Sequence, residues 1–155
     1  LVQTSVGQVY YQEASAAYNE SPARLMQVYL NTVRKLALIG LVPLALALLV
    51  APTLVKVYAG PEWATSGAYI RIIIFGLYFG FINAPIGTTY SIIGRQEIIL
   101  GLRVVSIIVR FGAMVLLRSD PILMLWALSG SMSLYYIVCN ALVYVNVRRL
   151  TARAA

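Results

Sequence analysis

The stretch that decides the fold is "LGLRVVSIIVRFGAMVLLR", residues 100–118. It is long and apolar enough to cross a bilayer as a helix, because about 20 residues cover about 30 Å of hydrocarbon. Yet it carries Arg103 and Arg110, which a helix would place on one face, about 10 Å apart along its axis. The fold must therefore provide a place for two positive charges inside a membrane.

The composition of the whole chain agrees with a membrane protein. Of its 155 residues, 61% are hydrophobic and 11% are charged, whereas a soluble domain has about 45–50% apolar and about 25% charged residues. The net charge of +7 would suggest nucleic acid for a soluble protein. Here most basic residues flank apolar runs, which is typical of membrane topology. We therefore expect a lipid bilayer, and no nucleic acid, as the partner.

Four apolar runs are long enough to span the membrane. Only helices and closed barrels satisfy every backbone group in lipid, and none of the runs alternates like a barrel strand. The sequence therefore predicts an all-α membrane protein whose transmembrane region covers residues 36–147. Its four helices are expected at residues 36–58, 70–93, 98–117 and 122–147.

The flanking segments are expected outside the hydrocarbon. Residues 1–35 are interpreted as a cytoplasmic leader that contains the end of a preceding span and an amphipathic helix. That helix starts with Ser21 as N-cap and Pro22 in the first turn, and we expect it to lie along the membrane surface. Residues 148–155 are expected to form a basic cytoplasmic tail. Because the chain starts without Met or a signal peptide, we expect the C-terminal piece of a larger transporter bundle.

The distribution of Lys and Arg predicts the orientation of the spans. Seven basic residues fall on one side of the membrane: Arg24, Arg34, Lys35, Arg95, Arg148, Arg149 and Arg153. Three fall on the other side: Lys56, Arg71 and Arg118. The excess places the leader, the turn near Arg95 and the C-terminus in the cytoplasm, by the positive-inside rule.

The two arginines within the third span suggest a binding site. An arginine at the centre of a helix costs about 2.5–3.5 kcal/mol, while each large aliphatic residue returns about 0.3–0.6 kcal/mol. Arg103, Ser106 and Arg110 share a face that we expect to turn toward a cavity and to bind substrate. The alternative is a structural pair, in which each arginine bonds an acid or a free carbonyl of a neighbouring helix. Glu97 is the nearest acid, and no acid in the chain matches the depth of Arg110.

The second span contains "FINAPIGTTYS", residues 81–91. Pro85 lacks an N–H and Gly87 loosens the helix, so we expect a kink or hinge at these two residues. Asn83 is a candidate substrate-binding residue, because broken helices line substrate sites in transporters. The alternative is that the proline only shapes the helix, since membrane helices tolerate it.

The fourth span is polar on part of its surface. Its small residues recur every four positions, as Ser129 and Ser133 do, and this spacing favours close helix packing. Tyr135, Tyr136 and Asn140 lie in the middle of the span. We interpret them as packing residues rather than as substrate contacts.

Several chemistries are excluded or disfavoured by what the chain contains. It has no histidine and a single cysteine, Cys139, so we expect no metal site, no cofactor, no internal disulfide and no catalytic triad. The five acids lie near span ends or outside the spans, which gives no paired carboxylates in the hydrocarbon. We therefore do not expect an enzyme.

The order of these features resembles a known transporter family. The segments are "VGQVYYQEASAAYNE", "YAGPEWATSGAYIRI" and "APIGTTYSIIGRQEI", at residues 6–20, 58–72 and 84–98. They are similar to the polysaccharide-biosynthesis and O-antigen flippases of the multidrug/oligosaccharidyl-lipid/polysaccharide exporter superfamily. The most telling residues are 60–63 with 68–72, and Pro85 followed by residues 94–96.

The resemblance implies both a fold and a function. It implies helices nine to twelve of a larger transporter whose N-terminal helices would complete a central cavity. It implies alternating access, and export of undecaprenyl-pyrophosphate-linked oligosaccharide across the bacterial inner membrane for lipopolysaccharide or exopolysaccharide synthesis. Arg110 and Arg103 fit the role of binding the anionic head group by their position. The alternatives are a drug/cation antiporter of the same superfamily and a structural membrane subunit without a substrate.

Overall fold

The computed structural model describes residues 2–154, which form helices and no strand. The long helices are α1 (Val2–Glu20), α2 (Pro22–Ala59), α3 (Ala64–Ile86), α5 (Gln96–Leu116) and α6 (Pro121–Ala154). The turn η1 (Pro61–Trp63) connects α2 to α3, and the short helix α4 (Thr89–Ile92) lies between α3 and α5. The predicted all-α fold is confirmed.

Four helical segments are long and apolar enough to cross a membrane, as the sequence predicted. They are Pro22–Ala59, Pro61–Ile92, Gln96–Leu116 and Pro121–Arg153. On α5, the outward face carries exposed aliphatic side chains, including Val104, Val105, Ile108 and Val109. Such a face is compatible with lipid and not with water, so the chain is a membrane-embedded protein.

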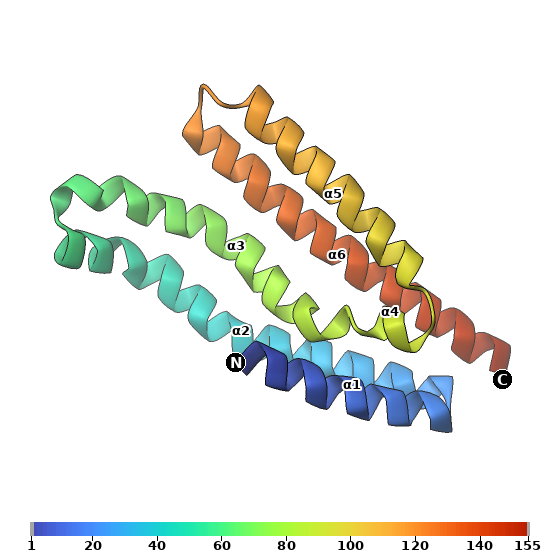
Figure 1. Ribbon diagram of the computed structural model, residues 1–155. Coiled ribbons are helices and arrows are strands. Elements are labelled where there is room, and N and C mark those ends of the chain that lie inside the picture. Colours follow the sequence, from blue (N-terminus) through green and yellow to red (C-terminus); the bar gives the residue numbers. More distant parts are fainter. Residues whose placement is uncertain (1, 155) are drawn as a thin grey trace.

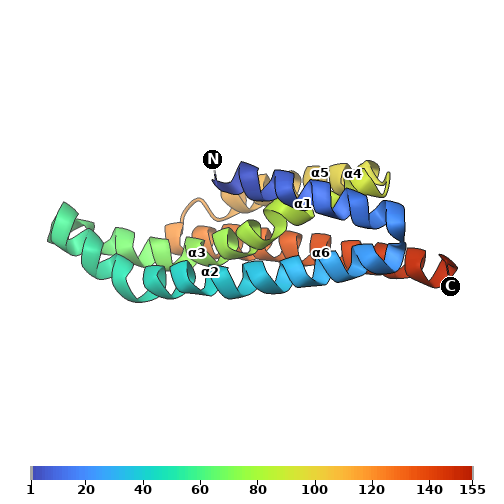
Figure 2. The same cartoon turned by 90° about the horizontal axis from the view of Figure 1, so that it is seen from below.

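The helices pair as two hairpins. α2 packs against α3, α5 packs against α6, and α6 also packs against α3 and α2 (Figure 1). Figure 2 shows α2, α3 and α6 in one layer, with α1 and α5 on the same side of that layer. α5 rests mainly on α6 and diverges from α3 (Figure 1). This divergence leaves room between α5 and α3.

The apolar core lies at one end of the bundle, where α1, the first half of α2, α4 and the second half of α6 meet. Its buried side chains are Tyr10, Ala14, Ala17, Leu25, Val28, Tyr29, Ile86, Tyr90, Val143 and Val147. The hydroxyl of Tyr10 lies 2.6 Å from Oγ1 of Thr89. Burial raises the pKa of Tyr10 to about 12, and either hydroxyl can be the donor of this bond. This hydrogen bond ties α1 to α4.

The segment before the first span differs from the expectation. α2 begins as predicted, with Pro22 in its first turn and the Ser21 hydroxyl accepting a hydrogen bond from the N–H of Arg24. It then runs without a break past Lys35, so no separate helix turns into the membrane there. Leu25 and Tyr29 are buried in the core rather than facing a membrane surface. Burial against α1 and α6 therefore decided the path of residues 22–35.

The last helix also differs from the expectation at its end. Asp120 caps α6, since its Oδ1 accepts hydrogen bonds from the N–H groups of Ile122 and Leu123 at 3.0 Å each. The helix does not end at Val147 but continues through residues 148–154. Its 34 residues extend about 51 Å at about 1.5 Å per residue. The predicted basic tail is therefore the last part of a helix that is longer than the hydrocarbon is thick.

Small residues allow α3 and α6 to approach closely. A Cβ atom on Gly76 would lie 3.2 Å from Cβ of Met132, and one on Gly80 would lie 3.1 Å from the Tyr136 ring. Ser129 is buried between the helices, where its hydroxyl donates to the carbonyl of Ile72. This agrees with the close packing expected from the small residues of the fourth span.

Pro52, which lies within α2, is contacted by two residues of α3. Pro52 has no N–H, so the carbonyl of Leu48 loses its helical donor. Nε of Arg71 donates to that carbonyl at 2.8 Å. A Cβ atom on Gly67 would lie 2.6 Å from Cα of Pro52, so α3 needs glycine at this crossing. Arg71 and Gly67 together hold α3 against the bend of α2.

We predict that Gly67→Ala lowers the free energy of unfolding by about 1–3 kcal/mol, because the added methyl group meets backbone that cannot move aside. The matched control is Gly101→Ala on α5, where an added Cβ has nothing within 4 Å. The control should be neutral or slightly stabilising. Denaturant unfolding of both variants in detergent measures the difference, and equal effects would contradict the packing described here.

Candidate functional site

A cavity of about 820 Å³ separates α5 from α3, with α6 forming its third wall. It is called the α3–α5 cavity here. Its lining residues are Gly76, Leu77, Gly80, Phe81, Asn83, Ala84, Gly87, Thr88, Ser91, Ile99, Arg103, Ser106, Ile107, Arg110, Met132, Tyr135 and Tyr136. All four predicted substrate-binding residues and one of the two hinge residues are among them.

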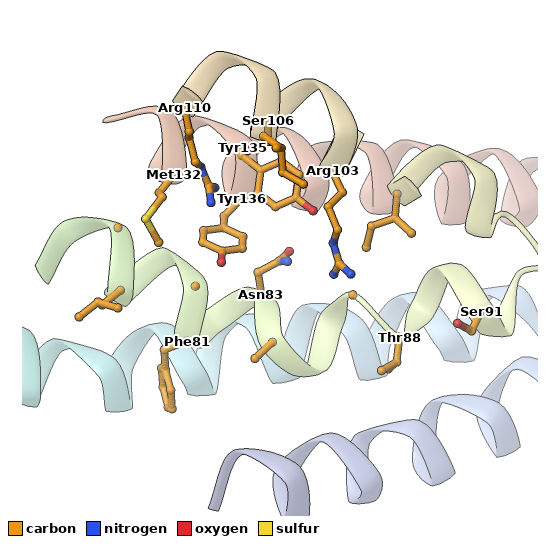
Figure 3. A pocket seen from close by; sticks show the side chains of 17 residues that line it. Phe81, Asn83, Thr88, Ser91, Arg103, Ser106, Arg110, Met132, Tyr135 and Tyr136 are labelled. Atoms are coloured by element: carbon orange, nitrogen blue, oxygen red, sulfur yellow. The ribbon is translucent and has the colours of Figure 1, made fainter. Parts of the chain in front are cut away.

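α5 contributes its polar face to the cavity. Arg103, Ser106 and Arg110 are spaced by three and four residues, so one side of a helix presents all three. Figure 3 shows both arginine side chains extending from α5 toward α3. All three residues line the α3–α5 cavity, as expected for this face. Ser106 is buried, Arg110 is half-buried and Arg103 is exposed. Whether these residues bind a substrate stays a prediction.

Arg110 lies deepest on this face and rests on an aromatic ring. Its guanidinium carbon is 5.7 Å from the centre of the Tyr135 ring, within the range of a cation–π interaction. Its Nε is buried and has no hydrogen-bond partner within residues 2–154. The ring offsets part of the cost of the charge, and the guanidinium keeps N–H groups free for a ligand.

Ser106 lies between the two arginines on α5, and within residues 2–154 its hydroxyl group also lacks a hydrogen-bond partner. Its side chain is buried, and its Oγ has no hydrogen-bond partner in the described part of the chain. A buried hydroxyl without a partner costs about 1–3 kcal/mol. Water or a ligand in the α3–α5 cavity would remove that cost.

The α3–α5 cavity carries positive charge without a compensating acid. Among the described residues the one ion pair joins Arg24 to Glu20, at 3.9 Å. Neither Arg103 nor Arg110 therefore pairs with Glu97 or with another acid of residues 2–154. None of the residues that line the cavity is Asp or Glu. Within residues 2–154 the alternative of a structural ion pair therefore finds no acidic partner.

Asn83 contributes less than its position in the sequence suggested. It is buried, and its Oδ1 accepts from Nδ2 of Asn140 at 2.9 Å. The same amide nitrogen donates to the carbonyl of Tyr136, and the carbonyl of Asn140 accepts from the Tyr29 hydroxyl at 2.9 Å. The oxygen of Asn83 thus links α3 to α6, and the backbone carbonyl of Asn140 links α6 to α2. The amide nitrogen of Asn83 remains as the donor for a ligand.

The predicted hinge residues lie at a real break in the second span. α3 ends at Ile86 and α4 starts at Thr89. Pro85 supplies no N–H, and its own carbonyl accepts from the Thr88 hydroxyl at 2.6 Å. Gly87 lines the cavity but has helical dihedral angles, φ −55 and ψ −25, so the observed backbone does not require glycine. The observed break therefore does not depend on glycine at position 87, and the hinge role of Pro85 and Gly87 stays a prediction.

The sequence reasoning missed the contribution of α6. Tyr135 and Tyr136 were interpreted as packing residues, but both line the α3–α5 cavity together with Met132. Tyr136 also packs against Gly80, so packing describes part of its role. The signal was the spacing of three and four residues from Met132, which puts all three on one helix face. Periodicity alone does not tell whether such a face meets another helix or a cavity.

Comparison of the chain with protein-family models, with curated proteins and with solved structures finds no significant match. The assignment of a function therefore depends on the geometry of the α3–α5 cavity and on the sequence features described above.

We predict an energetic coupling between Arg110 and Tyr135. In a double-mutant cycle of Arg110→Met with Tyr135→Leu, the unfolding free energies should deviate from additivity by about 0.5–2 kcal/mol. Replacing Tyr135→Leu by Tyr135→Phe keeps the ring and should preserve the coupling.

The matched control pairs Arg110→Met with Phe111→Leu. Phe111 is the next residue of α5 and is exposed on its outer surface, so the two substitutions should be additive within about 0.5 kcal/mol. Additivity of the Arg110 and Tyr135 substitutions would mean that the ring does not stabilise the charge.

Proposed function

We propose that the protein is a membrane flippase that moves a lipid-linked oligosaccharide, of the undecaprenyl-pyrophosphate type, across the bacterial inner membrane. The observation that carries this proposal is the half-buried Arg110, whose buried Nε has no partner in the described chain. An intramembrane arginine without an acid is expensive, and a negatively charged ligand would compensate it.

The charge of the α3–α5 cavity supports an anionic ligand. Arg103 and Arg110 are both on its wall, about 10 Å apart along the helix axis by their spacing of seven residues. Guanidinium groups bind phosphate oxygens through two parallel charge-assisted hydrogen bonds. Two such groups on one face suit an extended anion such as a pyrophosphate, with Ser106 between them as a further donor.

The rest of the cavity supports a ligand that also carries sugar. Its volume of about 820 Å³ falls in the range of sites for ligands of drug size, about 300–1,000 Å³. The rings of Tyr135 and Tyr136 line the same cavity as polar side chains of Asn83 on α3, Thr88 in the following turn and Ser91 on α4 (Figure 3). Aromatic faces together with hydrogen-bonding groups suit the C–H faces and hydroxyl groups of a sugar ring.

The proposed mechanism is alternating access between two bundles of helices. Because α5 packs on α6 and diverges from α3, a movement of the α5–α6 hairpin relative to α3 would change the width of the cavity. The interruption at Pro85 and Gly87 would let α3 and α4 follow that movement. In this proposal the C-terminus faces the cytoplasm, and N-terminal helices of the same transporter complete the cavity.

We predict that Arg110→Ala in the intact protein lowers export of the surface polysaccharide by about tenfold or more, because a charge-assisted hydrogen bond contributes about 1.5–3 kcal/mol. Arg110→Lys should retain part of the export, since it keeps the charge but loses the two-pronged geometry. Export is measured as polymer at the cell surface, normalised to the amount of transporter in the membrane.

The matched control is Arg118→Ala, which removes the same charge from the far end of the same hairpin, outside the α3–α5 cavity. It should leave export unchanged. Unchanged export by Arg110→Ala at normal protein levels would refute the proposed role. Loss of the protein from the membrane with Arg110→Met, with unchanged export per molecule, would favour a structural subunit.

A further inference from the structure

A second, smaller cavity lies between the α4–α5 turn and the C-terminal end of α6. It is called the Arg95 cavity here, and its volume is about 100 Å³. Its lining residues are Ile93, Arg95, Asn146, Arg149, Leu150 and Arg153. Half of them are arginines, and none is acidic.

The three arginines converge from two elements. Arg149 and Arg153 are one turn apart on the same face of α6, and Asn146 precedes them on that face. Arg95 comes from the turn between α4 and α5, where Gly94 adopts a positive φ of 67°. Figure 1 shows that this turn lies beside the C-terminal part of α6. The fold therefore brings together residues that are more than fifty positions apart in the sequence.

The three arginines are exposed and lie around one cavity, so together they create a positive potential that attracts an anion. Like charges four residues apart on a helix repel each other, and Arg95 adds a third charge to the same cavity. Arg95 is also the N-cap residue of α5, and no side chain caps the first N–H groups of that helix. The N-terminal end of a helix carries a partial positive charge, so it strengthens the positive potential beside Arg95.

The position of the Arg95 cavity along α6 indicates where the counter-ion comes from. α6 has 34 residues and extends about 51 Å, which exceeds the hydrocarbon thickness of about 30 Å. The cavity is formed by its last turns, from Asn146 to Arg153, so it lies at the depth of lipid head groups. Ile93 and Leu150 add apolar surface to the same wall.

We propose that the Arg95 cavity binds the head-group phosphate of an anionic phospholipid. The three guanidinium groups would hold the phosphate oxygens, and Ile93 and Leu150 would contact the start of the acyl chains. Basic pockets between membrane helices bind such head groups, and the charge count predicts this end to face the cytoplasmic leaflet, where anionic lipids are abundant. The bound lipid would join the start of α5 to the end of α6, independently of the function of the α3–α5 cavity.

The test measures stabilisation of the intact protein by lipid. Purified protein in a neutral detergent is titrated with phosphatidylglycerol or with phosphatidylcholine, and the melting temperature is followed. We expect phosphatidylglycerol to stabilise the wild-type protein with an apparent affinity at least about tenfold higher than that of phosphatidylcholine. An equal response to the two lipids would overturn the proposal.

Variants that remove the same number of charges distinguish lipid binding in the Arg95 cavity from general attraction of anionic lipid to a basic protein. The double variant Arg149→Gln/Arg153→Gln should lose about tenfold or more in apparent affinity for phosphatidylglycerol. The control Arg148→Gln/Arg118→Gln removes the same two charges from residues that do not line the cavity, and should lose about twofold or less. Equal losses in the two variants would overturn the proposal.

Two further measurements remove the remaining ambiguities. Arg95→Gln changes the wall that comes from the turn and should also weaken the binding of phosphatidylglycerol, so the outcome does not depend on the folding of the α6 variant. Inorganic phosphate at millimolar concentration should neither stabilise the protein nor displace the lipid. If it does both as well as phosphatidylglycerol, the site binds a free anion and the lipid assignment is wrong.

Discussion

The cost of a guanidinium group at membrane depth is the constraint on which the rest of this structure depends. Arg110 lies near the middle of a helix whose outer surface is aliphatic, so only one face of α5 can accommodate the charge. That face cannot pack tightly against α3, because tight packing would bury two arginines without partners. α5 therefore packs on α6, where the Tyr135 ring receives the charge at 5.7 Å. The α3–α5 cavity is the space that this arrangement leaves.

A second constraint comes from backbone groups that proline leaves without a donor. At Pro52 the carbonyl of Leu48 accepts a hydrogen bond from Nε of Arg71 on the neighbouring helix. At Pro85 the carbonyl that loses its helical donor is that of Phe81. The helix then breaks after Ile86, where the Thr88 hydroxyl donates to the Pro85 carbonyl. The first case fixes two helices to each other, and the second creates an interruption on the wall of the cavity. Because lipid offers no hydrogen bonds, each proline must be accommodated by neighbouring groups.

The two ends of the bundle differ in how firmly they are held. One end has the apolar core, in which side chains of α1, α2, α4 and α6 pack together and Tyr90 donates to the carbonyl of Cys139 at 3.0 Å. Toward the other end the tips of the two hairpins diverge (Figure 1). The α3–α5 cavity reaches from Gly76 and Arg110 to Ser91 and Ile99, next to the core. The proposed alternating access would move the diverging tips relative to the anchored end. The Arg95 cavity lies on the anchored end, where a bound head group would add to the anchor.

The sequence by itself determined the elements and their polarity. Run length predicted the four spans, because hydrocarbon thickness sets the length of a helix. Ser21 and the proline that follows it predicted one helix start, because capping is local. The spacing of Arg103, Ser106 and Arg110 predicted that they share one face, and the lack of an acid at the depth of Arg110 left its partner open. These features depend on neighbours within one or two turns.

Only the tertiary structure decided what each face meets. It showed that residues 22–35 continue α2 inside the core, because Leu25 and Tyr29 find partners on α1 and α6 that no local pattern reveals. It showed that the Tyr135 ring contacts the guanidinium group of Arg110, and that the side-chain oxygen of Asn83 accepts a hydrogen bond from Asn140. It also brought Arg95 to Arg149 and Arg153. Periodicity specifies the direction in which a side chain points, whereas its partner depends on how distant helices pack, and that is a property of the whole bundle.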